Sequence, residues 1–113
     1  MIPDPGRESN DAPEPSTVRG VRLEGRLLCA DASEAAVVVR HLPQHVALTR
    51  AEPGCLKFDV ESTADPLVWQ VIEQFVDRAA FEAHQARVAA SEWGRVTSGI
   101  ARDYAITPVH EQG

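Results

Sequence analysis

Alternation of apolar and charged residues marks two stretches of the chain. In Val18–Ala30, apolar side chains at every second position are separated by Arg22, Glu24 and Arg26. In residues 56–60, Leu, Phe and Val alternate with Lys and Asp, after a turn at Glu52–Cys55. A period of two predicts strands with one buried face. The apolar positions are Val21, Leu23, Leu27 and Cys29 in the first stretch and Leu56, Phe58 and Val60 in the second.

Two further stretches predict strands of different character. Leu67–Val76 is mostly apolar on both faces, which is typical of a strand in the middle of a sheet. Ile100–Thr107 has the length and content of a final strand. Asp65 and Pro66 form the turn that precedes the first of these two strands.

Helix start signals lie between the predicted strands. Asp31 stands three residues before Glu34, the spacing of a capping box, and a helix is expected from there to about Arg50. Pro43 is expected to kink or divide this helix, since it removes a backbone donor and crowds the preceding turn. Asp77 is an N-cap for a helix through about Ala90, and Ser91 starts a short helix. Their apolar positions are Phe81, His84 and Val88, then Trp93 and Val96.

The resulting order is β-α-β-β-α-β, which predicts an α+β, ferredoxin-like fold: an antiparallel sheet with both helices on one face. The first and third strands carry apolar residues on both faces. The simplest cover for the second face is the sheet of another copy, so we expect a homodimer through sheet-to-sheet packing.

Residues 1–17 contain four of the eight prolines and four acids against one base. Such a segment cannot bury enough apolar area to fold alone, so we expect a flexible acidic tail followed by one folded domain at residues 18–113.

Charge and composition exclude several classes of partner. The net charge is −6 and Lys57 is the only lysine, so nucleic acid is not expected as a partner. No stretch has the roughly 20 apolar residues of a membrane helix, and no secretory signal is recognised. We therefore expect a cytoplasmic protein without a membrane partner. Cys29 and Cys55 are expected as small buried hydrophobes, although sequence leaves open whether they ever pair.

Two runs resemble a known family. LPQHVALTRAEPGCLKFDV at residues 42–60 and EQFVDRAAFEAH at residues 73–84 resemble the antibiotic biosynthesis monooxygenase domain, in particular its small quinol-monooxygenase-like members. The resemblance covers roughly Arg22–Ile106. It implies a dimeric α/β barrel with a cavity between sheet and helices. It also implies oxygenation of a small aromatic quinol, phenol or anthrone without metal, flavin or haem, the substrate anion reducing oxygen directly.

The candidate catalytic pair is His84 and Glu73. His84 shares the inward helical face of Phe81 and Val88, so it needs a hydrogen-bond partner, and in the family pattern a strand glutamate accompanies this histidine. The pair could equally be structural. Gly54 and Pro53 set the turn after Glu52, and we expect no catalytic role for Glu52.

Other residues could contact substrate. His41 and His45 have i, i+4 spacing, but no third ligand is near, so no metal site is expected and His45 remains a candidate for facing the cavity. The other candidates for lining a pocket, each also explained by core packing, are Trp69, Phe81, Trp93 and Tyr104.

Two departures from the family narrow the chemistry. Haem-degrading relatives carry an asparagine on the first strand, and residues 18–30 contain none. Quinol-type members often have Ser-Pro-His after the second helix, where this chain has Ala90 to Trp93. Three hypotheses remain: a cofactor-independent monooxygenase, a non-catalytic dimeric module that binds a small hydrophobic ligand, and an assembly scaffold. A cavity beside a buried His84–Glu73 contact would favour the first, and a cavity filled by Trp69, Phe81 and Trp93 the third.

Overall fold

A computed structural model describes residues 18–110 of the chain. Seven elements follow one another in the predicted α+β order. They are β2 (Val18–Leu28), α1 (Ala32–Arg50), β3 (Cys55–Ser62), β4 (Val68–Phe75), α2 (Arg78–Ala89), α3 (Glu92–Val96) and β5 (Ala101–His110).

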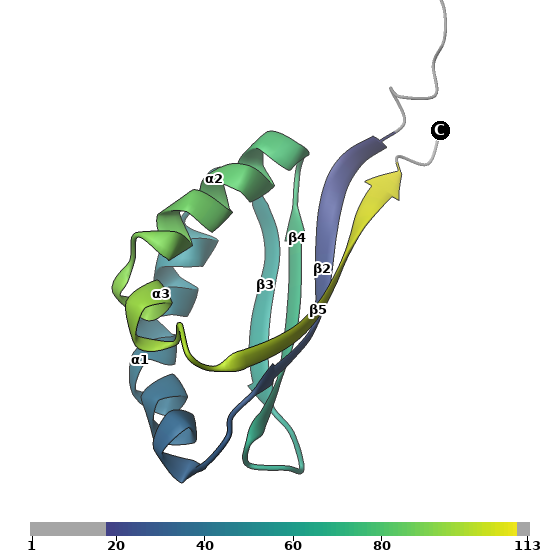
Figure 1. The fold of residues 1–113 in the computed structure, drawn as a ribbon. Helices are drawn as coiled ribbons and strands as arrows, with labels where there is room; N and C mark the ends of the chain where they lie inside the picture. Colours follow the sequence, from purple (N-terminus) through teal and green to yellow (C-terminus); the bar gives the residue numbers. More distant parts are fainter. Residues whose placement is uncertain (1–17, 111–113) are drawn as a thin grey trace, which may run out of the picture.

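The four strands form one antiparallel sheet in the order β3-β4-β2-β5, and the three helices lie together on one of its faces (Figure 1). This is the ferredoxin-like arrangement, so the predicted fold class is confirmed. As expected from its apolar composition, β4 is a central strand, paired with β2 and β3. The tail at residues 1–17 lies outside the described residues.

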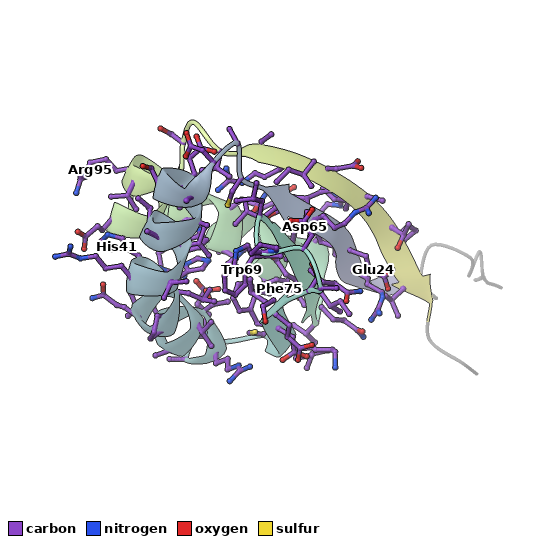
Figure 2. The ribbon with its side chains drawn as sticks, turned by 90° about the horizontal axis from the view of Figure 1, so that it is seen from below. Glu24, His41, Asp65, Trp69, Phe75 and Arg95 are labelled. Carbon is purple, nitrogen blue, oxygen red and sulfur yellow. The ribbon has the colours of Figure 1, made fainter. Side chains whose placement is uncertain are left out.

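The core lies between the helices and the sheet. The side chains that β2 turns toward the helices are the alternating apolar residues of its sequence, and α1 contributes the fully buried Val38. Trp69 and Phe75 of β4 lie in this layer, whereas His41 and Arg95 project from the outer side of the helices (Figure 2). The alternation in the sequence therefore identified the buried face of β2.

The helix caps agree with the sequence, with one difference in detail. The Asp31 and Asp77 carboxylates accept backbone N–H groups of Glu34 and Ala80 at 3.0 and 2.7 Å. The Glu34 side chain accepts from the N–H of Ala30 at 2.7 Å, one residue earlier than a simple capping box requires.

Of the two outcomes expected at Pro43, a kink or a division of the first helix, division is wrong, because α1 runs from Ala32 to Arg50 with Pro43 inside it. Proline deprives the carbonyl of Val39, four residues earlier, of its usual donor. Val39 is 60% exposed and Pro43 is exposed as well, so this break in the hydrogen-bond ladder faces away from the core.

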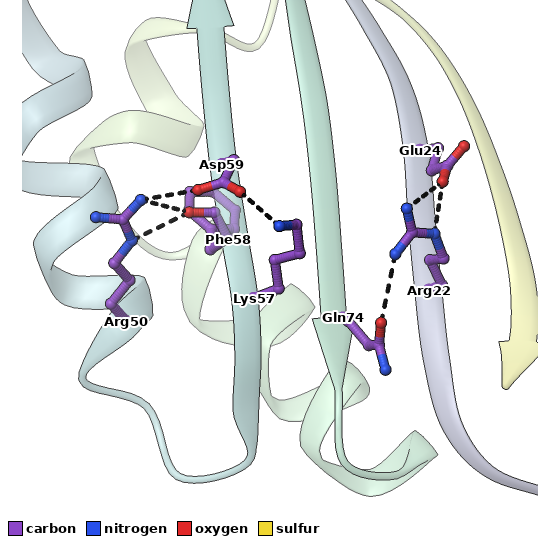
Figure 3. Close-up of polar contacts among 7 residues, drawn as sticks. All are labelled: Arg22, Glu24, Arg50, Lys57, Phe58, Asp59 and Gln74. Atoms are coloured by element: carbon purple, nitrogen blue, oxygen red, sulfur yellow. Dashed lines mark hydrogen bonds and ion pairs between the residues drawn. The ribbon is translucent and has the colours of Figure 1, made fainter. Parts of the chain in front are cut away.

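Polar contacts occupy one edge and the outer face of the sheet (Figure 3). Arg50 at the end of α1 donates two hydrogen bonds to the carbonyl of Phe58, at 3.1 and 2.8 Å, and pairs with Asp59. These contacts fasten α1 to the edge strand β3 and occupy an acceptor there. On the outer face, Arg22 pairs with Glu24 and reaches Gln74.

Two findings complete the fold. The cysteines at positions 29 and 55 are both free thiols, the first buried and the second half-buried. None of the helices in the described part of the chain is long and apolar enough to cross a membrane.

Gly54 is expected to be a sensitive position. Its φ of 87° is a conformation that other residues adopt at a cost, and an added Cβ would lie 2.7 Å from the Cβ of Ala80. We expect Gly54→Ala to lower the free energy of unfolding by about 1–3 kcal/mol, measured by urea denaturation.

Gly99→Ala is the matched control, because no atom lies within 4 Å of a Cβ added there and its φ is ordinary. It is expected to change the free energy of unfolding by less than about 0.5 kcal/mol. Equal effects of the two substitutions would contradict the assignment of strain to Gly54.

Candidate functional site

A cavity of about 310 Å³ lies between the sheet and the helices. Its floor comes from inward-facing residues of all four strands, and its roof from α1, α2 and α3. A volume of this size is at the lower end of small-molecule sites. The polar groups in its deepest part are His45, Glu73 and His84, which are each at most 6% exposed.

His84 of α2 is held by Glu52, which lies in the turn between α1 and β3. The His84 Nδ1 atom is 2.9 Å from Oε1 of Glu52. A carboxylate accepts but does not donate, so Nδ1 carries the hydrogen and the Nε2 atom of a neutral imidazole is left with its lone pair. Arg87, one turn further along α2, pairs with the other oxygen of Glu52 and donates to Thr49 Oγ1 at 3.0 Å.

Burial sets the protonation of His84. Removal from water lowers the pKa of His84, and the Glu52 carboxylate opposes the shift only in part. The imidazole is therefore neutral at pH 7. A neutral imidazole with a fixed tautomer is a base whose free nitrogen has a defined direction.

That free nitrogen faces Glu73 of β4. Nε2 of His84 lies 3.6 Å from Oε1 of Glu73, which is beyond a hydrogen bond, and Oε1 has no other partner among the described residues. Burial and the neighbouring Glu52 carboxylate raise the pKa of Glu73 to about 7. The predicted pair is thus brought together beside the cavity, where Nε2 of His84 is a proton acceptor and Glu73 is an acid that titrates near neutral pH.

His45 of α1 faces the cavity, as the sequence suggested. Its ring stacks on Trp93 with a centroid distance of 4.4 Å and an interplanar angle of 3°. Burial, with the charges of His84, Arg87 and Arg102, lowers the pKa of His45 to about 3. Its Nδ1 is buried without a partner among the described residues, so a neutral, unsatisfied nitrogen lies in the wall of the cavity.

Tyr104 of β5 also lines the cavity. It lies opposite Gly25 of β2, and a Cβ at Gly25 would come within 2.8 Å of the Tyr104 ring. The absence of a side chain there lets the ring lie against the floor. Burial raises the pKa of Tyr104, so its hydroxyl is a donor at neutral pH.

Two of the predicted pocket residues lie elsewhere. Trp69 packs against the core and Phe81 belongs to it, and neither is part of the cavity wall. Trp93 contributes one wall. The cavity is therefore not filled by these three aromatic side chains.

Sequence reasoning missed the side chain of Glu52. Its turn role is confirmed by the φ of Gly54, but the carboxylate also contacts a histidine 32 positions away. No local pattern signals such a distant contact. The one hint in the sequence was the number of partners that His84 needs. A buried imidazole has two ring nitrogens to pair, and Glu73 can pair with only one of them.

The described residues contain no group of three or more His, Cys, Asp or Glu side chains placed to hold a metal ion. His41 lies 4.0 Å from Glu92 at the outer side of the helices, while His45 turns inward. The i, i+4 histidines thus face different surroundings.

Known structures share this fold. PA3566 from Pseudomonas aeruginosa is 25% identical, with a TM-score of 0.63 over 86% of this chain and 98% of its own. MupZ from Pseudomonas fluorescens is 14% identical, with a TM-score of 0.66 over 79% of this chain and 67% of its own. An antibiotic biosynthesis monooxygenase is 21% identical, with a TM-score of 0.61 over 82% of this chain and 99% of its own.

No curated protein matches the chain significantly in sequence. The family model for antibiotic biosynthesis monooxygenases matches residues 28–95, which is more than half of the chain. This segment runs from the end of β2 into α3 and includes Glu52, Glu73 and His84. With the fold and the cavity on one face of the sheet, the match shows that the chain belongs to the antibiotic biosynthesis monooxygenase family.

Proposed function

We propose that the protein is a cofactor-independent monooxygenase that acts on a small aromatic quinol, phenol or anthrone-like substrate. The observation that carries the proposal is the free Nε2 of a neutral, buried His84 beside an unfilled cavity of about 310 Å³. A scaffold would have no need of an unsatisfied base facing such a space, which favours the enzyme over that hypothesis.

In this proposal His84 removes the proton from the substrate hydroxyl. Nε2 accepts the proton, and the imidazolium formed is stabilised by the Glu52 carboxylate at Nδ1. The substrate anion reduces oxygen, so that one oxygen atom enters the substrate and the other leaves as water. A quinol thereby becomes a hydroxyquinone without an external reductant.

Three neighbouring side chains bind the substrate without taking its proton. Glu73 in its protonated form can donate to a substrate oxygen, while Trp93 and His45 offer a flat wall for an aromatic ring. Glu52 is a positioning residue: it orients His84 and raises its basicity.

We also propose a homodimer formed through the outer face of the sheet. Leu28, Val68 and Ile72 are half-buried apolar residues on this face, where β2 and β4 pair, and ionic groups surround them. Another sheet packed there would remove this apolar surface from water.

His84→Ala is expected to lower oxygen uptake with a quinol or anthrone by about 10²–10⁴-fold, because the substrate loses its base. Uptake is measured with metal-stripped protein, and spontaneous autoxidation is subtracted. His41→Ala is the matched control, since His41 lies outside the cavity wall, and it is expected to keep full activity.

Glu52→Gln separates positioning from simple packing. We expect a lower rate and an acid limb of the pH profile, the rise in rate as His84 loses its proton, that lies at lower pH, because the carboxylate that raises the His84 pKa is gone. Full activity of His84→Ala would show that His84 is not the catalytic base. Binding of the ligand without oxygen uptake, by the unsubstituted chain and by every variant, would favour the non-catalytic binding module.

The raised pKa of Glu73 predicts that the stability of the fold depends on pH. Its folded pKa of about 7 lies above the ordinary glutamate value of 4.5, so between these values the folded state holds a proton that the unfolded state has lost. Stability therefore falls as the pH rises through this window. Glu73→Gln has no such titrating group. The difference in free energy of unfolding between Glu73→Gln and the unsubstituted chain is therefore expected to shift in favour of the variant, by an amount on the order of 3 kcal/mol, between pH 4.5 and 7.5.

The measurement is urea denaturation of both chains across this range. The lowered pKa values of His45 and His84 act in the opposite direction, decreasing stability as the pH falls below 6.5. Both rings are neutral in the folded state near pH 7 in either chain, so the difference between the two curves in the upper part of the range reports Glu73. Parallel stability curves would show that Glu73 has an ordinary pKa.

Ile72→Glu tests the dimer. The side chain is half-buried on the outer face, so the substitution leaves the core intact and places a charge at the centre of the proposed contact. Sedimentation equilibrium is expected to give a dimer for the unsubstituted chain and a monomer for the variant. A monomeric unsubstituted chain, or a variant that still dimerises, would refute the proposed interface.

A further inference from the structure

The cavity has two chemically different ends. The groups that line its deep part, including Glu73 and His84, are buried, whereas Gln85, Ser98 and Arg102 in its wall are exposed. The cavity thus opens to solvent between α2, α3 and β5, and Arg102 stands at this mouth.

The guanidinium group of Arg102 is held in place. Its Nη1 atom donates to the carbonyls of Thr97 and Ile100 at 2.9 and 2.8 Å, and Nη2 donates to Thr97 Oγ1 at 2.8 Å. Thr97 is fully buried, so the anchor is rigid. These contacts use three of the five guanidinium N–H donors, and the Tyr104 hydroxyl is a further hydrogen-bond neighbour of the group.

The charge of Arg102 has no carboxylate partner in the part of the chain that the structure describes. Its three acceptors are uncharged, and among residues 18–110 it forms no ion pair with a carboxylate, in contrast to Arg87, which pairs with Glu52. Its field reaches inward, because Arg102 opposes the rise in the Tyr104 pKa and contributes to the lowered His45 pKa. A fixed cation beside a cavity, with no carboxylate partner among the described residues, suits an anionic ligand group.

The deep end is unsuited to a carboxylate, which carries its charge before it enters, whereas a hydroxyl group there becomes an anion only by giving its proton to His84. Glu73 lines it, Glu52 contacts His84 there, and the pKa of Glu73 is already raised by burial and by its acidic neighbour. A second carboxylate in that place would meet like charge without a cation, because Arg87 is committed to Glu52. The polarity of the cavity therefore fixes which way an acidic ligand would enter.

We propose that the substrate carries a carboxylate, which Arg102 holds at the mouth while the hydroxyl-bearing ring reaches His84. This inference rests on the proposed function and narrows its substrate class from phenols in general to aromatic acids. Arg102 is then a specificity-determining residue, and the loop at residues 97–100 sets its position.

The test compares 2,5-dihydroxybenzoate with its uncharged methyl ester at pH 7. Dissociation constants are measured through the change in tryptophan fluorescence, to which Trp93 in the cavity wall contributes, and checked by calorimetry. We expect the acid to bind about 10- to 100-fold more tightly than the ester, the range of a hydrogen bond to a charged group. In Arg102→Gln the ratio of the two constants is expected to fall to about one.

Arg95→Gln is the matched control. Arg95 lies nearby on α3, but its side chain is 73% exposed, it pairs with Glu92 and it points away from the sheet (Figure 2). It is expected to keep the full preference for the acid. Because each ratio compares two ligands on the same protein, a change in the amount of folded protein does not alter it.

Arg102→Lys is the second variant, in case Arg102→Gln does not fold. Lysine keeps the charge but lacks the planar donors, so we expect a ratio above one but below that of the unsubstituted chain. Equal binding of acid and ester by the unsubstituted chain, binding of neither, or an unchanged ratio in the Arg102 variants would overturn the inference.

Binding requires no turnover, so the two proposals can fail separately. A preference for the acid that depends on Arg102, without oxygen uptake, would overturn the monooxygenase and leave the acid-binding cavity. Uptake of oxygen with equal use of acid and ester would leave the monooxygenase and overturn the role of Arg102.

Discussion

The hydrogen bond between His84 and Glu52 is the interaction on which the rest of the site depends. It joins α2 to the turn between α1 and β3, and it decides which imidazole nitrogen carries the hydrogen. Without it, a ring that is 3% exposed would lose its charged partner and its tautomer would be undefined. Arg87 holds Glu52 from the other side, so the orientation of His84 is supported from two successive turns of one helix.

The electrostatics of the cavity follow from this arrangement. Glu52 pairs with Arg87 and His84, whereas no cation among the described residues pairs with Glu73, and burial and the Glu52 charge raise its pKa. His45 is kept neutral by burial and by surrounding positive charge. Buried polar atoms without hydrogen-bond partners among the described residues thus lie in the interior, and the positive charge of Arg102 lies at the mouth. This is an environment in which a ligand with hydroxyl groups can satisfy atoms that the protein leaves unpaired.

The elements themselves could be predicted because their signals are local. Asp31, Asp77 and Ser91 accept backbone N–H groups at the three helix starts, as their positions in the sequence suggested. Pro43 does not end α1, because the effect of a proline on a helix depends on the side of the helix it occupies. Pro43 lies on the exposed side of α1. Leu56 alternates like a buried strand residue yet is 60% exposed, since the register shifts between Cys55 and Lys57 and takes it out of the pairing pattern.

The sequence by itself determined the order of the elements, the buried face of β2, the central place of β4 and the inward direction of His84. These follow from periodicity and from short-range capping, which act over a few residues. Only the tertiary structure decided that Glu52 contacts His84, that Trp69 and Phe81 lie outside the cavity wall, and that Arg102 stands at the mouth. Those contacts join residues from separate elements. They depend on how far each side chain reaches across the layer between helices and sheet, and periodicity carries no information about that distance.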